Sequence, residues 1–352
     1  MNKNIFFILT LFVGLLATDT AQAGNPDRQG EAGAYELLLN PWARSAGLHS
    51  MTTSMITGVE AMRVNPAGLG RINKTEIQIS YADYMRGTDI SMNALGFAQK
   101  IGENGTFGLS IMALDFGDTE ITTTLNPEGT GINYSPSFFN LGLAYAHVFE
   151  NKVSVGILFR AVSETLSDLT AFGLAIDAGI QYVTGDQDQI KFGISLRNIG
   201  TPMTFSGEGL AFPTSNPDGD GNYQLTINNR AASYELPSAL NIGGSYDILP
   251  AERHRVTLIA NFTANSFSQD QIGGGLEYSF NEMFQVRGGY KYEVGQTAVG
   301  SEGGSIYSGL SAGATVKVPL SKENKNDLAI DYAYRQTNLF DDTHNIALRI
   351  NL

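Results

Sequence analysis

The chain has 352 residues, a formal net charge of −13 and no cysteine. The absence of cysteine excludes a disulfide scaffold and a thiolate metal site. The negative charge argues against nucleic acid as a partner, because neutralising phosphates requires basic patches. The chain also contains 40 glycines, 19 phenylalanines and 15 tyrosines. This composition fits a β-barrel with small residues on its inner face and aromatic residues on its outer face.

Residues 1–23 have the organisation of a secretory signal peptide. Lys3 gives a short basic start, residues 5–17 form a continuous apolar run, and residues 21–23 (AQA) fit a cleavage site. The apolar run is too short to span a membrane comfortably. We therefore expect export of the chain and a mature N-terminus at Gly24.

Residues 24–74 differ in pattern from the rest of the chain. Apolar residues at helical spacing are followed by a proline that keeps any helix short: Tyr35, Leu38, Leu39 and Trp42, with Pro41 between them. A second motif predicts a turn in which glycines permit left-handed backbone angles: Asn65, Pro66, Ala67 and Gly68, followed by Leu69 and Gly70. We expect this segment to form a small hatch that plugs a barrel from the periplasmic side.

From residue 75 to residue 352 the chain is a succession of alternating segments. In 172–182, Phe172, Leu174 and Ile176 fall on one face of a strand, and Gly173, Ala175 and Asp177 fall on the other. Segments of this kind predict fourteen strands, near 75–83, 90–100, 106–117, 137–148, 152–163, 171–183, 190–198, 238–246, 254–265, 270–280, 283–293, 308–317, 325–335 and 343–352. The fold class is therefore all-β, a fourteen-stranded antiparallel transmembrane β-barrel with a small N-terminal hatch.

The register of these strands predicts which side chains face lipid. Ile157 is expected to face outward and Arg160 to face the lumen. The other charged or polar residues expected in the lumen are Asp177, Gln181, Lys191, Arg197, Arg287, Lys291, Asp331 and Arg335. A mixed-charge filling of this kind is expected to obstruct a continuous apolar route through the barrel.

The connections between strands alternate in length. Short turns are expected around 102–105, 150–151 and 281–282, whereas the segments 118–136, 199–237 and 294–307 are long. Barrels of the outer membrane have short periplasmic turns and longer extracellular loops. With a periplasmic N-terminus, every long segment falls outside, so we expect the chain in the cell outer membrane.

The sequence offers little support for catalysis or a cofactor. Four scattered histidines have no metal-ligand spacing, and neither a nucleophile elbow nor a phosphate-binding loop occurs: His49, His147, His254 and His344. The glycine run 273–275 predicts a kink in the barrel or a place where the hatch approaches the wall. Residues 216–222 resemble the start of a calcium loop, but Tyr223 and Asn229 stand where that pattern needs Gly and Glu. We interpret 216–222 as a turn, and we predict no enzyme, cofactor or metal.

The long loop 199–237 contains apolar residues that need an explanation: Met203, Phe205, Leu210, Phe212 and Pro213. Such residues either pack into the barrel mouth or contact a partner or hydrophobic ligand. Both interpretations stay open at this point.

Several segments together resemble the PorV/PorQ family of type IX secretion outer-membrane proteins. They are 39–48 (LNPWARSAGL), 65–69 (NPAGL), 177–182 (DAGIQY) and 196–200 (LRNIG), the last followed by Pro202, Met203 and Phe205. That family sits within the larger group of barrels that resemble the FadL long-chain fatty-acid transporters. The resemblance implies a fourteen-stranded barrel with an N-terminal hatch that binds protein partners of the secretion machinery or the signal domains of secreted cargo.

The sequence therefore supports three functional interpretations. The first is a non-enzymatic outer-membrane barrel that binds protein partners at its extracellular face through Phe205, Leu210 and Phe212, as a component or paralogue of the type IX cargo shuttle. The alternative is a FadL-like channel for uptake of hydrophobic small molecules. The third is a purely structural barrel within a complex. The charged lumen favours protein binding over transport.

Overall fold

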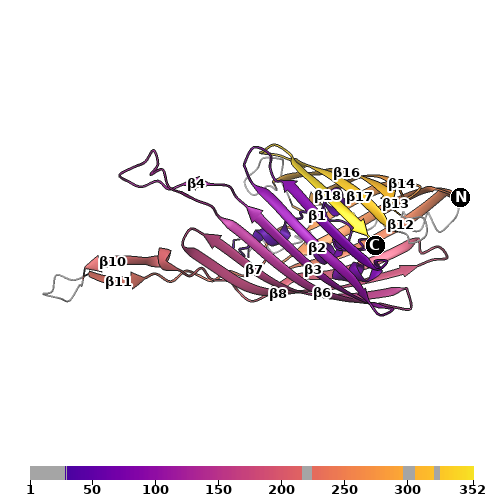
Figure 1. Cartoon of the computed structure of the whole chain (residues 1–352), viewed down its shortest axis with the longest axis horizontal. Helices are drawn as coiled ribbons and strands as arrows, with labels where there is room; N and C mark the ends of the chain where they lie inside the picture. The colour runs from indigo at the N-terminus through magenta and orange to yellow at the C-terminus, as the bar shows by residue number, and fades with distance from the viewer. Residues whose placement is uncertain (1–27, 29, 216–223, 296–305, 321–325) are drawn as a thin grey trace.

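The structure is a computed structural model that describes residues 28, 30–215, 224–295, 306–320 and 326–352. The expected signal peptide, 1–23, and the calcium-like residues 216–222 lie outside the described residues. The described chain forms a closed barrel of fourteen antiparallel strands (Figure 1). These are β1 (Thr75–Asp83), β2 (Ser91–Ile101), β3 (Gly105–Asp115), β6 (Ser137–Phe149), β7 (Val153–Leu166), β8 (Leu169–Thr184), β9 (Ile190–Gly200), β12 (Ala239–Ala251), β13 (His254–Asn265), β14 (Gln271–Phe280), β15 (Phe284–Glu293), β16 (Tyr307–Pro319), β17 (Asp327–Thr337) and β18 (Thr343–Asn351).

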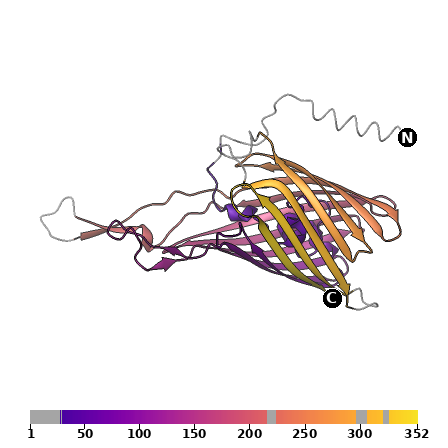
Figure 2. The ribbon, with the colours of Figure 1, turned by 90° about the horizontal axis from the view of Figure 1, so that it is seen from above.

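All fourteen strands predicted from the alternation are confirmed. Each pairs with its neighbour in the chain, and β1 closes the barrel on β18, with Ile77 opposite Ile350. Two further hairpins lie in the long extracellular loops: β4 (Thr119–Glu120) with β5 (Asn133–Tyr134), and β10 (Ala211–Ser215) with β11 (Gln224–Asn228). Both project far beyond the barrel as two arms at the same end (Figures 1 and 2).

The register of the strands is as predicted. The side chain of Ile157 is 38% exposed on the outer wall, whereas Arg160 is 4% exposed and faces inward. Along β8, exposed Phe172, Leu174 and Ile176 alternate with buried residues. A closed barrel with an apolar outer wall belongs in the outer membrane, since closure leaves no strand edge unpaired in lipid. Among the described helices, none has the length and apolar character needed to cross a membrane.

The N-terminal segment lies inside the barrel, and its described residues contain four very short helices. They are η2 (Tyr35–Leu38), α2 (Ala43–Ala46), α3 (Ala61–Val64) and η3 (Pro66–Arg71). The helices are short, as Pro41 led us to expect, and most of their residues are buried, including Leu37 and Leu69, as is Trp42 before α2. Burial against the barrel wall, rather than helix propensity, therefore holds this segment together.

Residues 66–71 form the short 3₁₀ helix η3, not the turn with left-handed glycines expected from the sequence. Asn65 caps it by accepting a hydrogen bond from the Ala67 N–H at 3.2 Å. The glycines are required for space: a Cβ on Gly68 would lie 2.1 Å from the Ile56 carbonyl oxygen, and one on Gly70 would lie 2.7 Å from Val148. The motif thus permits close packing of the segment on the barrel wall.

One backbone carbonyl of the N-terminal segment contacts both strands at which the barrel closes. The Pro41 carbonyl accepts a hydrogen bond from Ser80 Oγ of β1 at 2.7 Å and another from Asn345 Nδ2 of β18 at 2.8 Å. Asn345 is fully buried and Ser80 nearly so. The segment is therefore attached to the barrel at its closing pair of strands.

Candidate functional site

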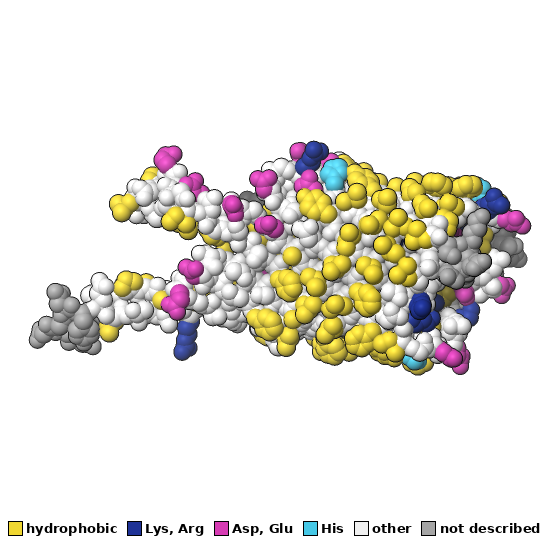
Figure 3. All heavy atoms as spheres, viewed as in Figure 1, with side chains coloured by type: hydrophobic (Ala, Val, Ile, Leu, Met, Phe, Trp, Pro, Cys, Tyr) yellow, Lys and Arg dark blue, Asp and Glu magenta, His cyan; other side chains and the backbone are white. Residues whose placement is uncertain are grey.

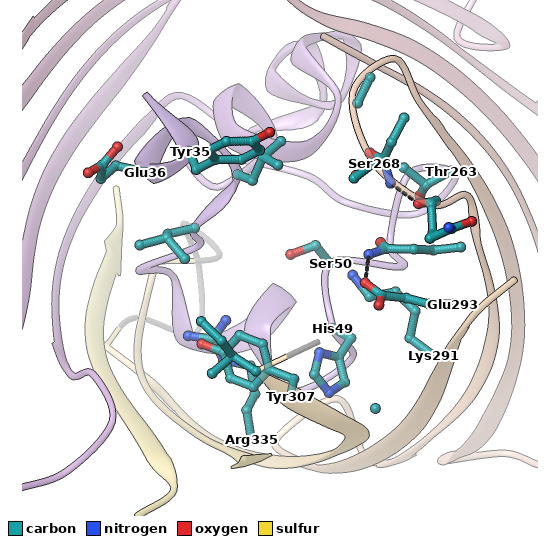
Figure 4. A pocket seen from close by; sticks show the side chains of 18 of the residues that line it. Tyr35, Glu36, His49, Ser50, Thr263, Ser268, Lys291, Glu293, Tyr307 and Arg335 are labelled. Atoms are coloured by element: carbon teal, nitrogen blue, oxygen red, sulfur yellow. Dashed lines mark hydrogen bonds between the residues drawn. The ribbon is translucent and has the colours of Figure 1, made fainter. Parts of the chain in front are cut away.

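A cavity lies in the extracellular half of the barrel, above the N-terminal segment. Its volume is about 580 Å³. Tyr35, Glu36 and Ser50 of the N-terminal segment form part of its lining, while Gln269 and Ile306 come from extracellular loops. Figure 4 shows the labelled side chains arranged around an open central space. A volume in this range is typical of sites for small molecules.

The lining of this extracellular cavity is divided into two chemically different sides. One side is apolar and includes Leu38, Leu39, Ile90, Leu114 and Phe116. The other side, on β12 to β15, carries amides and hydroxyls: Asn241, Thr263, Asn265, Gln271 and the ammonium of Lys291. A ligand that fills the cavity would therefore meet apolar surface at one end and hydrogen-bonding groups at the other.

Charged side chains in the cavity are oriented by fixed contacts. The Arg335 guanidinium lies over the Tyr307 ring, 4.8 Å from its centroid, and donates to the Asn40 carbonyl at 3.3 Å. Gln271 Nε2 donates to Glu293 Oε1 at 2.8 Å. Burial lowers the pKa of His49 well below its ordinary value, and the nearby Lys291 and Arg335 charges lower it further, so this imidazole is neutral.

A single turn of the N-terminal segment separates the extracellular cavity from a second one. His49 and Ser50 line the extracellular cavity, whereas Leu48 and Thr52 line a second cavity of about 290 Å³ on the periplasmic side. The periplasmic cavity is polar, with Arg44, Lys191, Arg255, Glu277, Glu282 and Lys317 in its lining. The turn 48–52, which we call the septum, is thus the partition between the two cavities.

The septum packs against a glycine-rich patch of the wall. Leu48 and Met51 are each 1% exposed and pack with Ile259. A Cβ on Gly275 would lie 2.6 Å from the Leu48 side chain, and one on Gly273 would lie 2.3 Å from Met51. The glycine run 273–275 is therefore a place where the N-terminal segment approaches the wall, one of the two outcomes expected from the sequence.

The charged residues expected in the lumen are indeed inward-facing. Several form pairs across adjacent strands, such as Arg160 with Asp177 at 2.7 Å and Arg287 with Glu277 at 3.0 Å. An extracellular cavity of about 580 Å³ remains beside these pairs, with Arg197, Lys291 and Arg335 in its lining. The charged lumen therefore leaves room for a ligand, although its described residues form no continuous apolar route between the two cavities.

The hatch motif lies at the wall of β8. Asn65 is fully buried, and its Nδ2 donates to the carbonyls of Thr53 at 2.9 Å and Ile180 at 3.1 Å. Pro66 and Ala67 lie against Gly156 of β7, where a Cβ would come within 2.3 Å of the Pro66 backbone. Gly68 packs on Ile56, as described above. These four residues fix the segment to the barrel and do not line either cavity.

The four loop residues expected to bind a partner are separated by the structure. Met203 is fully buried and exchanges two backbone hydrogen bonds with Tyr234, each 2.9 Å long. The Phe205 ring packs 5.8 Å from the Tyr234 ring, and Leu210 is half-buried in η4 (Glu208–Leu210). Phe212, on the projecting hairpin, is 42% exposed. The base of the loop, with Met203 and Phe205, thus packs as a lid on the barrel, whereas Phe212 belongs to the projecting β10–β11 hairpin.

Tyr234 connects this lid to the N-terminal segment. Its hydroxyl donates to Glu164 Oε2 at 2.6 Å, and its ring covers Gly33, where an added Cβ would come within 2.3 Å. Burial and the neighbouring Glu164 carboxyl raise the pKa of Glu36. Sequence reasoning missed this connection and the cavity residues, because neither follows from alternation within one strand.

The comparisons with known proteins concern the fold alone. No family model matches the chain, and no curated protein matches it by sequence. The toluene transporter TbuX of Ralstonia pickettii aligns with a TM-score of 0.54 and 15% identity, over 89% of this chain and 99% of that one. The toluene transporter TodX of Pseudomonas putida aligns with a TM-score of 0.53 and 12% identity, over 89% and 97%. The chain therefore has the fold of these two toluene transporters.

Proposed function

We propose that the chain is an outer-membrane channel for uptake of hydrophobic small molecules, with residues 24–74 acting as its hatch. The observation that carries this proposal is the extracellular cavity of about 580 Å³. Its apolar side, which includes Leu114 and Phe116, suits the body of a hydrophobic molecule. Its polar side suits a ligand that also has a hydrogen-bonding group. The fold shared with two toluene transporters supports the same reading.

The route proposed for the ligand crosses the septum. A molecule in the extracellular cavity is separated from the periplasmic cavity by the turn 48–52, whose Leu48 and Met51 pack against Ile259 and against glycines of the wall. On the glycine side, the wall presents no side chain that would block a movement of this turn. A displacement of the turn 48–52 would therefore join the two cavities without breaking any strand pairing.

The experiment measures uptake of the fluorescent probe N-phenyl-1-naphthylamine by intact cells carrying the chain. Ala239→Phe should reduce uptake towards that of cells without the chain, because Ala239 is 3% exposed, lines the cavity and would place a ring in it. Ile242→Phe is the matched control, because Ile242 lies on the same strand but is 45% exposed to lipid. Uptake that is the same for Ala239→Phe and for the unchanged chain would reject the channel.

A second variant tests the septum. Met51→Ala removes a side chain that closes the partition and should raise uptake of the same probe above that of the unchanged chain. Met55→Ala is its control, because Met55 packs beside the septum but lines only the periplasmic cavity. If uptake depends on Ala239 but not on Met51, the ligand leaves the extracellular cavity by another route.

The second candidate function is docking of a protein partner, as in type IX secretion. The observation that favours it is the apolar face of the β10–β11 hairpin, where Phe212 lies opposite Ile227 and both are more than 40% exposed. Binding energy usually concentrates in a few aromatic anchors, each costing roughly 2 kcal/mol or more on truncation. Phe212→Ala should then deplete the proteins that co-purify from detergent-solubilised membranes. Phe205→Ala should loosen the lid instead, and an unchanged set of proteins with both variants would exclude docking at this loop.

A further inference from the structure

The outer wall of the barrel contains a depression. It lies across β17, β18, β1, β2 and β3 and has a volume of about 570 Å³. Its lining is almost wholly apolar and includes Ile79, Leu95, Ile111, Ile346 and Leu348. Figure 3 views this side of the molecule, with hydrophobic side chains spread over these strands. We call this depression the wall groove.

The groove has a simple cause in the sequence. Four outward positions form a row across neighbouring strands: Tyr81, Asn93, Ala113 and Phe139. Tyr81 and Phe139 are large and more than 40% exposed, while the two residues between them are small. The missing bulk at Asn93 and Ala113 leaves a gap between two aromatic side chains.

A second depression continues the groove towards the extracellular end. It has a volume of about 410 Å³ and shares Asn93 and Ala113 with the wall groove. Its lining also contains polar residues: Asp115, Ser135 and Ser137. The surface therefore changes from apolar to polar along one continuous path, at the level where the strands end and the loops begin.

The charge of the polar end is negative. Asp115 is exposed and belongs to the lining, and Asp118 accepts a hydrogen bond from Ser135. Within the described residues, no lysine or arginine lines either depression. An anionic headgroup would be repelled here, whereas an ammonium group would be attracted.

We propose that the wall groove and its polar extension bind one membrane lipid with an amine headgroup. The acyl chain lies between Tyr81 and Phe139 over Ala113, and the ammonium lies near Asp115 and the Asn93 amide. The occupant is a lipid because the groove opens on the wall of a barrel that stands in the outer membrane, where acyl chains are the surrounding solvent. The site is separate from the cavities of the proposed channel, which lie inside the barrel.

The test uses the full chain reconstituted in vesicles of equal parts phosphatidylethanolamine and phosphatidylglycerol. After extraction in mild detergent, native mass spectrometry counts the lipids that remain bound. We expect one phosphatidylethanolamine retained in preference to phosphatidylglycerol. Ala113→Phe fills the gap and should lower retention roughly tenfold, the effect of losing a few apolar contacts. Ala161→Phe is the matched control, an outward alanine of β7 outside the groove.

Asp115→Asn tests the headgroup separately and should remove the preference between the two lipids without abolishing retention. Heat-modifiable migration on a gel confirms that each variant has assembled. If Ala113→Phe does not assemble, Ile111→Trp takes its place in the test. The proposal is overturned if the unchanged chain retains no lipid or retains both lipids equally, or if Ala113→Phe and Ala161→Phe behave alike.

Discussion

Removing the Arg160 side chain tests how the lumen charges are accommodated. Arg160 donates to Asp177 Oδ2 from Nε at 2.8 Å and from Nη2 at 2.7 Å. The Nη2 group also donates to the Met62 carbonyl of the N-terminal segment at 2.8 Å. Asp177 is 1% exposed, and its other oxygen accepts from the Asn198 N–H at 2.7 Å. Arg160→Ala would leave a buried carboxylate without its nearest cation.

The expected cost follows from that burial. Breaking a buried ion pair by removing one partner costs about 3–5 kcal/mol, because the remaining charge stays desolvated. Ile157→Arg, on the lipid face of the same strand, should cost about 2–4 kcal/mol near the membrane midplane. The two substitutions are therefore comparable, and Arg160→Ala is not the milder change that an unpaired lumen arginine would give. The nearby Arg63 and Arg197 reduce the expected loss of stability in Arg160→Ala, since their positive charges partly compensate the charge of Asp177.

Urea unfolding of the barrel in detergent, followed by loss of heat-modifiable migration, measures both variants. The double variant Arg160→Ala with Asp177→Ala is the decisive control, because it removes the orphaned charge and should recover part of the lost stability. A double variant no more stable than Arg160→Ala would refute the reasoning from the buried carboxylate. A large loss for Arg160→Ala beside no loss for Ile157→Arg would instead refute the assigned register.

Three further predictions concern the attachment of the N-terminal segment, the titration of Glu36 and the location of the full chain. Asn65→Ala removes two hydrogen bonds to the Thr53 and Ile180 carbonyls and leaves the buried Ala67 N–H without an acceptor, the last at about 1–3 kcal/mol. Proteolysis in detergent should therefore cut the N-terminal segment sooner while the barrel stays intact, and equal rates would show that the motif is dispensable. Burial raises the pKa of Glu36. The stabilising contribution of this carboxyl group is therefore fully present below the ordinary carboxyl pKa and is lost as the pH rises through the raised pKa. Glu36→Gln should reduce the decline in the free energy of unfolding between pH 4 and 8, and an unchanged pH profile would contradict the argument. The full chain should fractionate with the outer membrane and migrate differently on gels when unheated, and recovery in the soluble periplasm would rule out the barrel.

The fold could be predicted from the sequence because alternation acts locally. The alternation within one strand shows which of its faces is apolar. Ile157 could therefore be assigned to the lipid face and Arg160 to the lumen without knowledge of the neighbouring strands. The end of β7 was harder to predict, because the strand continues beyond 163 to Leu166 and its alternation of buried and exposed residues is lost there.

The candidate site could not be predicted in the same way. The cavity depends on which lumen side chains pair across strands, and no pattern within one strand encodes the contact of Arg160 with Asp177. Likewise, the sequence of 199–237 gives no sign that Met203 is buried in a lid while Phe212 stands on an arm. The glycine run 273–275 was a local signal of the septum, because it predicted either a kink in the barrel or a place where the hatch approaches the wall.

The contacts of the Pro41 carbonyl bear on the order in which the barrel is assembled. Its two donors, Ser80 and Asn345, lie on the first and last strands of the barrel, which are adjacent only in the finished structure. A carbonyl already bonded to Ser80 of the first strand offers its second lone pair to the last strand as that strand arrives. The N-terminal segment can thus guide the final pairing, and it is enclosed by the same event. A variant that weakens these bonds would then slow the closing step of biogenesis even where the completed barrel is no less stable.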